Sequence, residues 1–152
     1  MITALLQRYL LRRCIRRGLQ IAADCRVIGV PHFGPEPWLI SIGRHVTISS
    51  GVTFINHDGG TWVFRDQPKY RDVIKFGRIT IHDNCFIGFG STLLPGVTIG
   101  RRCAIKRCIL DENCVIPDGM QIGMDAVLDA KRFFVTKRGV VLVTRDMLRG
   151  LS

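Results

Sequence analysis

Residues 79–100 read ITIHDNCFIGFGSTLLPGVTIG, and their aliphatic side chains recur at every sixth position. The repeat runs through Ile81, Ile87, Leu93 and Ile99. A spacing of six fits neither a helix, which repeats every ~3.6 residues, nor one continuous strand, which repeats every ~2. It fits a chain that turns a corner after each short strand, so that three strands complete one coil.

The same period continues on both sides of this stretch. Downstream it passes through Ile105, slips by one residue, and resumes at Leu110, Ile116 and Ile122. Upstream it includes Ile21, Val27, Ile42, Ile48 and Phe54. Glycine often follows the aliphatic position, where it would tolerate a left-handed corner. The sequence therefore predicts an all-β fold, a left-handed parallel β-helix of about four to five coils with a distorted corner within residues 105–110.

Three segments fall outside the repeat and divide the single domain. Residues 1–18 predict an N-terminal amphipathic helix over 2–17 that ends at Gly18, and its apolar side chains are expected to share one side: Ile2, Leu5, Leu6, Tyr9, Leu10 and Ile15. The β-helix occupies 19–126 and contains a loop insertion at 55–78. Residues 127–152 predict a hairpin, with Gly139 in its turn, and a short helix. A long ordered loop in a regular solenoid indicates function.

Charge is concentrated at the two ends of the chain. The 152 residues are 47% hydrophobic and 22% charged, which excludes global disorder, and the net charge is +10. Residues 1–18 carry five Arg and no acid. Such charge is either an ordinary solvated surface or a face for an anionic ligand or a membrane. The helix at 2–17 either makes peripheral membrane contact or packs over the open end of the prism. Nucleic acid is disfavoured because no binding motif accompanies the charge.

The cysteines fit the repeat better than they fit a metal site. Five of the six occupy the small position of a repeat: Cys25, Cys85, Cys103, Cys108 and Cys114. No C-x-x-C pair occurs, and a free cysteine buries well as a small hydrophobe. We therefore expect no metal and no disulfides. Free thiols, together with the lack of a long apolar segment or a secretory signal, lead us to expect a cytoplasmic protein.

Residues 20–100 resemble the hexapeptide-repeat O-acetyltransferases that modify sugars and polysaccharides. The resemblance is carried by ISIGRHVTISSGVTFINHDGG at 40–60 and by the stretch at 79–100. It implies acetyl-CoA as acyl donor and a homotrimer with active sites between neighbouring prisms. The family's catalytic histidine lies in an N/T-H-D-G-G motif, which falls on His57. His is also the natural general base near neutral pH.

The resemblance implies further site residues around His57 and on one prism edge. For the saccharide acceptor we expect Asn56, Asp58 and Trp62, with Asp58 either orienting the imidazole or forming the turn before Gly59. For acetyl-CoA we expect Phe86, Phe89, Gly90, Ser91, Lys106 and Arg107. Lys106 and Arg107 stand where the family has small residues, so they either block the pantetheine arm or pair with the CoA phosphates.

Residues 101–151 resemble a different family, the C-terminal β-helix of bacterial ADP-glucose pyrophosphorylase (glucose-1-phosphate adenylyltransferase). The matching sequence runs from RRCAIKRCILDENCVIPDGM to FFVTKRGVVLVTRDMLRGL. In that enzyme the segment supports assembly and helps bind a phosphorylated activator, which implies an effector role for Arg145 and Arg149, with Lys131 and Arg132 nearby in the hairpin. The chain is thus expected to be an O-acetyltransferase or, alternatively, a non-catalytic β-helix module for oligomerisation or effector binding.

Overall fold

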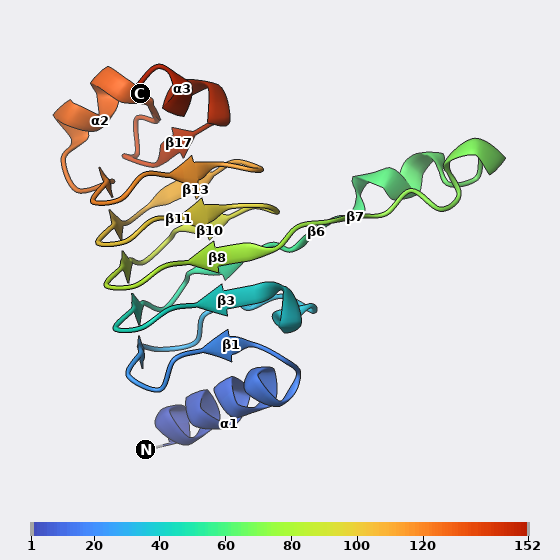
Figure 1. Cartoon of the computed structure of the whole chain (residues 1–152), viewed down its shortest axis with the longest axis horizontal. Helices are drawn as coiled ribbons and strands as arrows, with labels where there is room; N and C mark the ends of the chain where they lie inside the picture. Colours follow the sequence, from blue (N-terminus) through green and yellow to red (C-terminus); the bar gives the residue numbers. More distant parts are fainter. Residues whose placement is uncertain (1, 152) are drawn as a thin grey trace.

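The computed structural model describes residues 2–151, together with the side chains of residues 4–151. Short strands form three five-stranded sheets that make the faces of a triangular prism. Figure 1 shows the coils stacked as successive rungs, with helix α1 at one end of the stack and helices α2 and α3 at the other. The left-handed parallel β-helix predicted from the six-residue period is confirmed.

Each sheet takes one strand from each successive coil. The first sheet contains, in spatial order, β1 (Gln20–Ile21), β3 (Ile40–Ile42), β8 (Ile79–Ile81), β11 (Thr98–Ile99) and β14 (Val115–Ile116). The second contains β15 (Gln121–Ile122), β12 (Ala104–Ile105), β9 (Phe86–Ile87), β4 (Thr47–Ile48) and β2 (Arg26–Val27). The third contains β16 (Phe134–Val135), β17 (Val141–Val143), β13 (Cys108–Leu110), β10 (Thr92–Leu93) and β5 (Thr53–Phe54). Within these sheets every pairing is parallel except that of β16 with β17.

The aliphatic position of the repeat forms the core. Ile87, Leu93, Ile99 and Ile105 are fully buried, and Ile81 is 1% exposed. The strand register places the aliphatic residue of one coil beside that of the next, as in the pairing of Ile81 with Ile99. Burying one such side chain stabilises the fold by about 1.5–3 kcal/mol, so the repeat itself supplies the driving force for the prism.

Three glycines that follow the aliphatic position are needed for close approach between coils rather than for left-handed backbone. Gly43, Gly88 and Gly100 do not have positive φ angles, whereas several corner residues do, among them His45 at 55° and Asn84 at 61°. A Cβ atom on Gly100 would lie 2.8 Å from the Ile116 carbonyl oxygen of the next coil. The expectation that the glycine after the aliphatic position serves a left-handed corner is therefore wrong at these three positions and confirmed at Gly123, whose φ is 77°.

The one-residue slip in the repeat appears as a tight corner at Arg107. Ile109 pairs with Thr92, and Leu110 pairs with Leu93, so the step from Ile105 to Leu110 is one residue short. Arg107 has a left-handed φ of 48° three residues before Leu110, as Asn84 has 61° three residues before Ile87 in a corner of normal length. The five-residue step predicted within 105–110 is confirmed, and a distortion of its corner stays a prediction.

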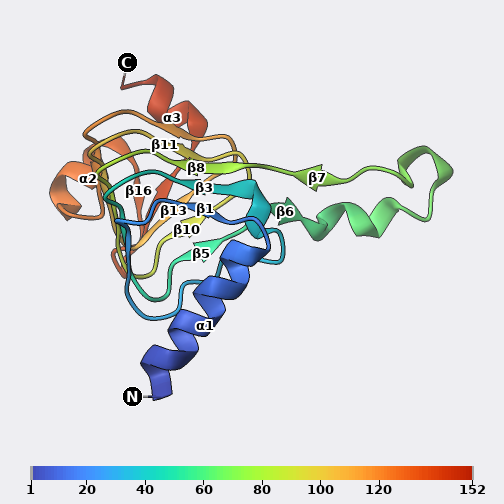
Figure 2. The same cartoon turned by 60° about the horizontal axis from the view of Figure 1, so that its bottom comes forward.

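Helix α1 (Ile2–Arg16) lies across the first coil, as Figure 2 shows, and its buried side differs from the predicted one. Gln7, Leu10, Leu11 and Cys14 face the first coil and the loop after β2, around a small apolar hollow. Much of the predicted apolar side is exposed instead, namely Leu5, Leu6, Tyr9 and Ile15. The predicted contribution of the Ile2 side chain lies outside the described residues.

The C-terminal segment contains a helix that the sequence reading missed. Residues Ala126–Arg132 form helix α2, capped by the Asp125 carboxylate, which accepts from the amides of Val127 and Leu128. Lys131 and Arg132 therefore lie on a helix, and their predicted place in the hairpin is wrong. The predicted hairpin follows as β16 and β17, and the predicted short helix is α3 (Arg145–Arg149).

The insertion at 55–78 forms an arm, which we define as residues 57–76. It contains strand β6 (His57–Asp58), the 3-10 helices η2 (Gly59–Phe64) and η3 (Pro68–Tyr70), and strand β7 (Lys75–Phe76). Figure 1 shows the arm projecting sideways from the middle of the coil stack. A shorter 3-10 helix, η1 (Pro37–Leu39), interrupts the loop that enters β3. Across residues 2–151, no helix combines the length and the apolar character needed to span a bilayer.

Candidate functional site

His57 lies at the base of the arm and contacts a carboxylate from a different loop. Its Nδ1 atom is 2.8 Å from Oε2 of Glu36, which comes from the loop between β2 and β3. The His57 side chain is 40% exposed and that of Glu36 is 13% exposed, so the pair has a sheltered acid and an accessible imidazole.

Local sequence fixes Glu36 in place. Prolines precede and follow it, which restricts the backbone on both sides. The Glu36 carbonyl accepts from the Leu39 amide at 3.0 Å as η1 begins. Arg17, just after α1, donates to the Pro35 carbonyl at 2.6 Å. Glu36 therefore sits in a loop held from both the coil and the N-terminal helix.

This geometry sets the tautomer of the imidazole. An ionised carboxylate only accepts hydrogen bonds, so Nδ1 of His57 must carry the proton that is donated to Glu36. The other ring nitrogen, Nε2, then has a lone pair. The arrangement can accept a proton from a hydroxyl at Nε2 while Glu36 stabilises the resulting imidazolium.

The base of the arm is anchored on both strands. His57 pairs with Phe76 and Asp58 with Lys75 in an antiparallel ladder. Lys75 Nζ also hydrogen-bonds Glu112 on the fourth coil, and this hydrogen bond raises the pKa of Lys75. The anchors hold the imidazole in place relative to the prism.

Asp58 forms the turn rather than orienting the imidazole. Its Oδ1 atom accepts from the Gly60 amide at 2.8 Å, which caps η2. Its Oδ2 atom lies 3.9 Å from Lys75 Nζ. Of the two roles that the sequence left open, the structure shows the turn-forming one.

Asn56 is buried beneath the site. It is fully buried, and its backbone carbonyl accepts from the Gly77 amide at 2.7 Å. Its side-chain Nδ2 donates to the Gly77 carbonyl at 3.5 Å, and its Oδ1 atom has no partner. These bonds join the two ends of the insertion. Contact of Asn56 with a substrate stays a prediction.

A hollow of about 300 Å³ opens beside His57. Apart from His57 and Glu36, it is lined by Asp58, Gly59, Arg65, Ile74, Lys75 and Phe76. The imidazole lies against Phe76, with ring centroids 5.9 Å apart. Trp62, predicted to contact the acceptor, lies further out on η2 and is 75% exposed. The hollow is therefore open, and its lining combines charged side chains with the apolar Ile74 and Phe76.

The predicted acetyl-CoA residues lie at a different corner of the prism. His57 follows β5, whereas Phe89, Gly90 and Ser91 lie between β9 and β10. Phe89 is 63% exposed and covers Gly51 of the preceding coil. The Phe86 ring lies against Gly88 in the same turn. Within one chain, the imidazole and this edge do not form one pocket.

Ser91 and Arg107 are engaged in internal contacts. The Ser91 side chain is fully buried and donates to the Gly88 carbonyl at 2.9 Å. Arg107 donates through its guanidinium to the Arg138 carbonyl in the hairpin turn, and its amide donates to the Phe89 carbonyl at 3.0 Å. Lys106, beside it, is exposed. Arg107 therefore joins the predicted cofactor edge to the C-terminal hairpin.

The predicted effector arginines lie among acidic side chains. Arg149 pairs with Asp146 at 3.1 Å on the same turn of α3. Arg145 lines a shallow hollow with Asp111, Glu112 and Asp146. On α2, Arg132 donates to the buried Asp129 carboxylate at 3.0 Å and to the Gln121 carbonyl at 2.9 Å. An effector role for Arg145 and Arg149 stays a prediction.

The cysteines pack in the core as the repeat predicted. Cys85, Cys103, Cys108 and Cys114 are buried, Cys14 and Cys25 are half-buried, and all six are free. Burial raises the pKa of the Cys108 thiol to about 12 and that of Cys114 to about 11. Within residues 2–151, no group of three His, Cys, Asp or Glu side chains could hold a metal ion.

Comparison with known proteins assigns this chain to a family. The profile described as GlmU-like, C-terminal hexapeptide matches residues 67–143, just over half of the chain. The chain belongs to this hexapeptide family. It is 52% identical over 97 residues to Protein CapG of Staphylococcus aureus, and that match covers 62% of this chain and 55% of CapG.

A second relative is an adenylyltransferase. The chain is 50% identical over 104 residues to the glucose-1-phosphate adenylyltransferase of an Enterobacter species, a match that covers 68% of this chain and 24% of that enzyme. The hexapeptide chain thus spans about half the length of CapG and about a quarter of the adenylyltransferase. Both resemblances predicted from the sequence are confirmed.

Solved structures share the coil architecture. A hexapeptide-repeat-containing acetyltransferase from Vibrio cholerae superposes with a TM-score of 0.53 at 20% identity. The superposition covers 76% of this chain and 73% of that one. This solved neighbour of the chain is a hexapeptide-repeat acetyltransferase, and at 20% identity the likeness establishes the fold alone.

Glu36 is the residue that the sequence reading missed. It lies in a Pro/Gly loop without a motif, 21 residues before His57. The available signal was an isolated acid between two prolines, in a loop otherwise free of acids. Such a signal indicates a rigid position and does not identify the partner.

Proposed function

We propose that this hexapeptide-family protein is an acetyl-CoA-dependent O-acetyltransferase that acts on a hydroxyl of a sugar or polysaccharide, with His57 as general base. The observation that carries the proposal is the 2.8 Å contact between Nδ1 of His57 and Oε2 of Glu36. An exposed histidine needs no buried acid for packing, whereas a general base benefits from one that fixes its tautomer.

The chain's own residues would handle the proton. Nε2 of His57 takes the proton from the acceptor hydroxyl, while the Glu36 carboxylate holds Nδ1 and balances the new charge. Acetyl-CoA supplies the acetyl thioester, and its thiolate leaves when the hydroxyl oxygen bonds to the acetyl carbon. His57 then returns its proton to the leaving sulfur. The hollow is lined by no Ser or Cys, which favours direct transfer without an acyl-enzyme.

The separation of His57 from the predicted acetyl-CoA residues supports a homotrimer. His57 and the Phe89–Ser91 edge lie at different corners of one prism, so a complete site needs a neighbouring copy. A backbone N–H of the Phe89–Ser91 edge would stabilise charge on the thioester oxygen. Phe89 offers an exposed ring for the pantetheine arm, and the exposed Lys106 is the group suited to CoA phosphates, since Arg107 is bonded to the hairpin.

Turnover with a panel of sugars tests the proposal. Acetyl-CoA binding is measured by calorimetry, and CoA release is followed with each acceptor. His57→Ala should lower kcat by about 10²–10⁴-fold with little change in acetyl-CoA affinity. His82→Ala, an exposed histidine on the next coil, is the matched control and should keep full activity. Full activity of His57→Ala would refute the assignment, and a protein that binds no acetyl-CoA would instead be the non-catalytic module.

A further inference from the structure

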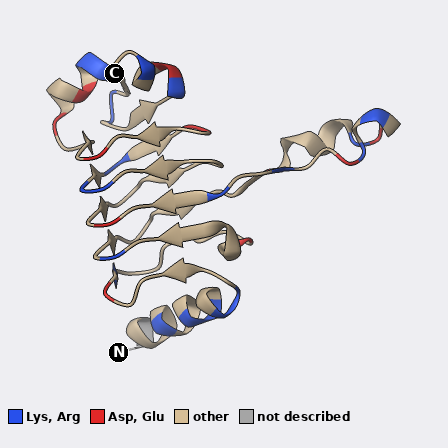
Figure 3. Cartoon of the chain, viewed as in Figure 1, with Lys and Arg blue, Asp and Glu red and all other residues tan. Residues whose placement is uncertain are grey.

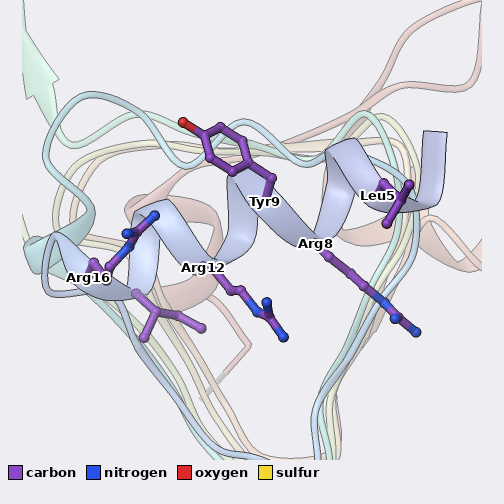
Figure 4. A pocket seen from close by; sticks show the side chains of 6 residues that line it. Leu5, Arg8, Tyr9, Arg12 and Arg16 are labelled. Carbon is purple, nitrogen blue, oxygen red and sulfur yellow. The ribbon is translucent and has the colours of Figure 1, made fainter. Parts of the chain in front are cut away.

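Helix α1 presents a second surface that the proposed acetyl transfer does not use. We define its outer face as Leu5, Arg8, Tyr9, Arg12, Ile15 and Arg16, which line a hollow of about 560 Å³ along the helix. Figure 4 shows that all the side chains that line this hollow come from α1. From their arrangement and charge we propose that this outer face docks the protein onto the surface of an anionic lipid bilayer.

The opposite side of α1 packs against the prism, so the outer face points toward solvent. Leu11 and Cys14 pack against the hydrophobic core, and Gln7 donates to the Val27 carbonyl at 2.5 Å. Residues 7, 11 and 14 follow the three-to-four spacing of one helical face. The outer face lies on the other side of the helix, so docking requires no unfolding of α1.

The outer face alternates apolar and cationic side chains. Arg8, Arg12 and Arg16 are spaced one turn apart and therefore form a single row. Beside this row, Leu5 is 64% exposed and Tyr9 is 55% exposed. Guanidinium groups bind phosphate in bidentate fashion, while Leu and Tyr insert at the boundary between headgroups and acyl chains. The combination fits a helix that lies in a membrane interface.

The charged side chains of α1 are all positive. Residues 1–18 contain five Arg and no acid, and Figure 3 shows the basic residues along α1. Among residues 4–151, no ion pair involves Arg8, Arg12 or Arg16. Each Arg near an anionic leaflet strengthens binding about fivefold, so the row alone contributes roughly 100-fold.

These features favour a bilayer over the other occupants of such a surface. A second copy of the chain would oppose two rows of arginines, which repel each other. Nucleic acid would pair with the arginines but leave Leu5 and Ile15 without an apolar partner. The position of α1 at one end of the coil stack, seen in Figure 1, leaves the arm clear of a bound surface.

Vesicle flotation of the full chain tests the proposal. Wild-type protein is mixed with vesicles of phosphatidylglycerol and phosphatidylcholine, with pure phosphatidylcholine vesicles, and with a duplex oligonucleotide. We expect flotation with the anionic vesicles only, weakened by added salt. Arg8→Gln, Arg12→Gln and Arg16→Gln together should lower the partition coefficient roughly 100-fold.

Two further variants separate docking from general electrostatic adsorption. Arg44→Gln, Arg101→Gln and Arg138→Gln remove the same charge from exposed positions away from α1 and should change binding by less than about threefold. Leu5→Ser with Tyr9→Ser keeps the charge and should lower binding about tenfold. Equal losses from the two arginine triples, no effect of the Ser pair, or binding to the oligonucleotide without vesicle binding would each overturn the proposal.

Discussion

Replacing Glu36 with glutamine tests whether its carboxylate acts through His57. The substitution keeps the size of the side chain and removes its charge. A hydrogen bond to a charged group is worth about 1.5–3 kcal/mol against about 0.5–1.5 for a neutral one, so the loss is about 1–1.5 kcal/mol. Glu36 is 13% exposed, so little solvent screens its charge, while His57 is 40% exposed, so water can stabilise part of the imidazolium. The expected result is a fall in kcat of about tenfold.

The assay follows CoA release with the best acceptor from the sugar panel. The KM for acetyl-CoA should stay constant, because Glu36 contacts the imidazole and is not one of the residues predicted to bind the cofactor. Asp24→Asn is the matched control, since it also replaces a carboxylate by its amide, at an exposed turn between β1 and β2. Its kcat should change by less than about twofold.

A double variant decides how Glu36 contributes. If the carboxylate acts by orienting His57, then Glu36→Gln has nothing to add once His57 is alanine, and the double variant should match His57→Ala. A further tenfold loss in the double variant would refute the reasoning, because Glu36 would then act independently of the imidazole. Unchanged kcat in Glu36→Gln alone would refute it as well.

Two further predictions concern stability. Burial raises the pKa of Cys108 to about 12. Above about pH 9 the unfolded state releases this thiol proton, whereas the folded state keeps it. The part of the free energy of unfolding that depends on this thiol is therefore highest below about pH 9 and falls as the pH rises toward 12. Between about pH 8.5 and about pH 10.5, urea denaturation should show wild type losing about 2 kcal/mol more than Cys108→Ala, and equal losses would contradict the assignment. Leu93 is fully buried in the core, so Leu93→Ala should lower the free energy of unfolding by about 2–5 kcal/mol. Leu5 is 64% exposed, so Leu5→Ala should change it by less than about 0.5 kcal/mol. A small effect at Leu93 in the same denaturation assay would count against the core as described.

The fold could be predicted because a six-residue period acts through burial. Each aliphatic residue such as Ile99 must point into the prism, and one-dimensional spacing is enough to show it. The short helix α2 was missed because its length gives little periodicity. Its only clear sequence signal is Asp125 at the cap, and its tertiary anchor, the buried Asp129, accepts from the Gly123 amide at 2.8 Å.

The candidate site was predictable only in part, for a related reason. His57 stands in a motif, whereas Glu36 is brought to it by the folding of two separate loops, and no local pattern records such a contact. On α1, the buried side with Gln7, Leu11 and Cys14 carries no arginine, so the lack of charge, rather than the count of apolar residues, was the signal in the sequence. Gln7 then fixes this side by donating to the Val27 carbonyl.

The arm leaves and rejoins the prism at a single point, where the Gly77 amide bonds the Asn56 carbonyl at 2.7 Å. Because its ends are adjacent, the number of residues between them does not alter the phase of the coils on either side. Evolution can therefore lengthen, shorten or exchange this segment while the solenoid stays intact. The same junction offers protein engineers a graft site, where an arm from another protein could bring a new acceptor preference to an unchanged scaffold.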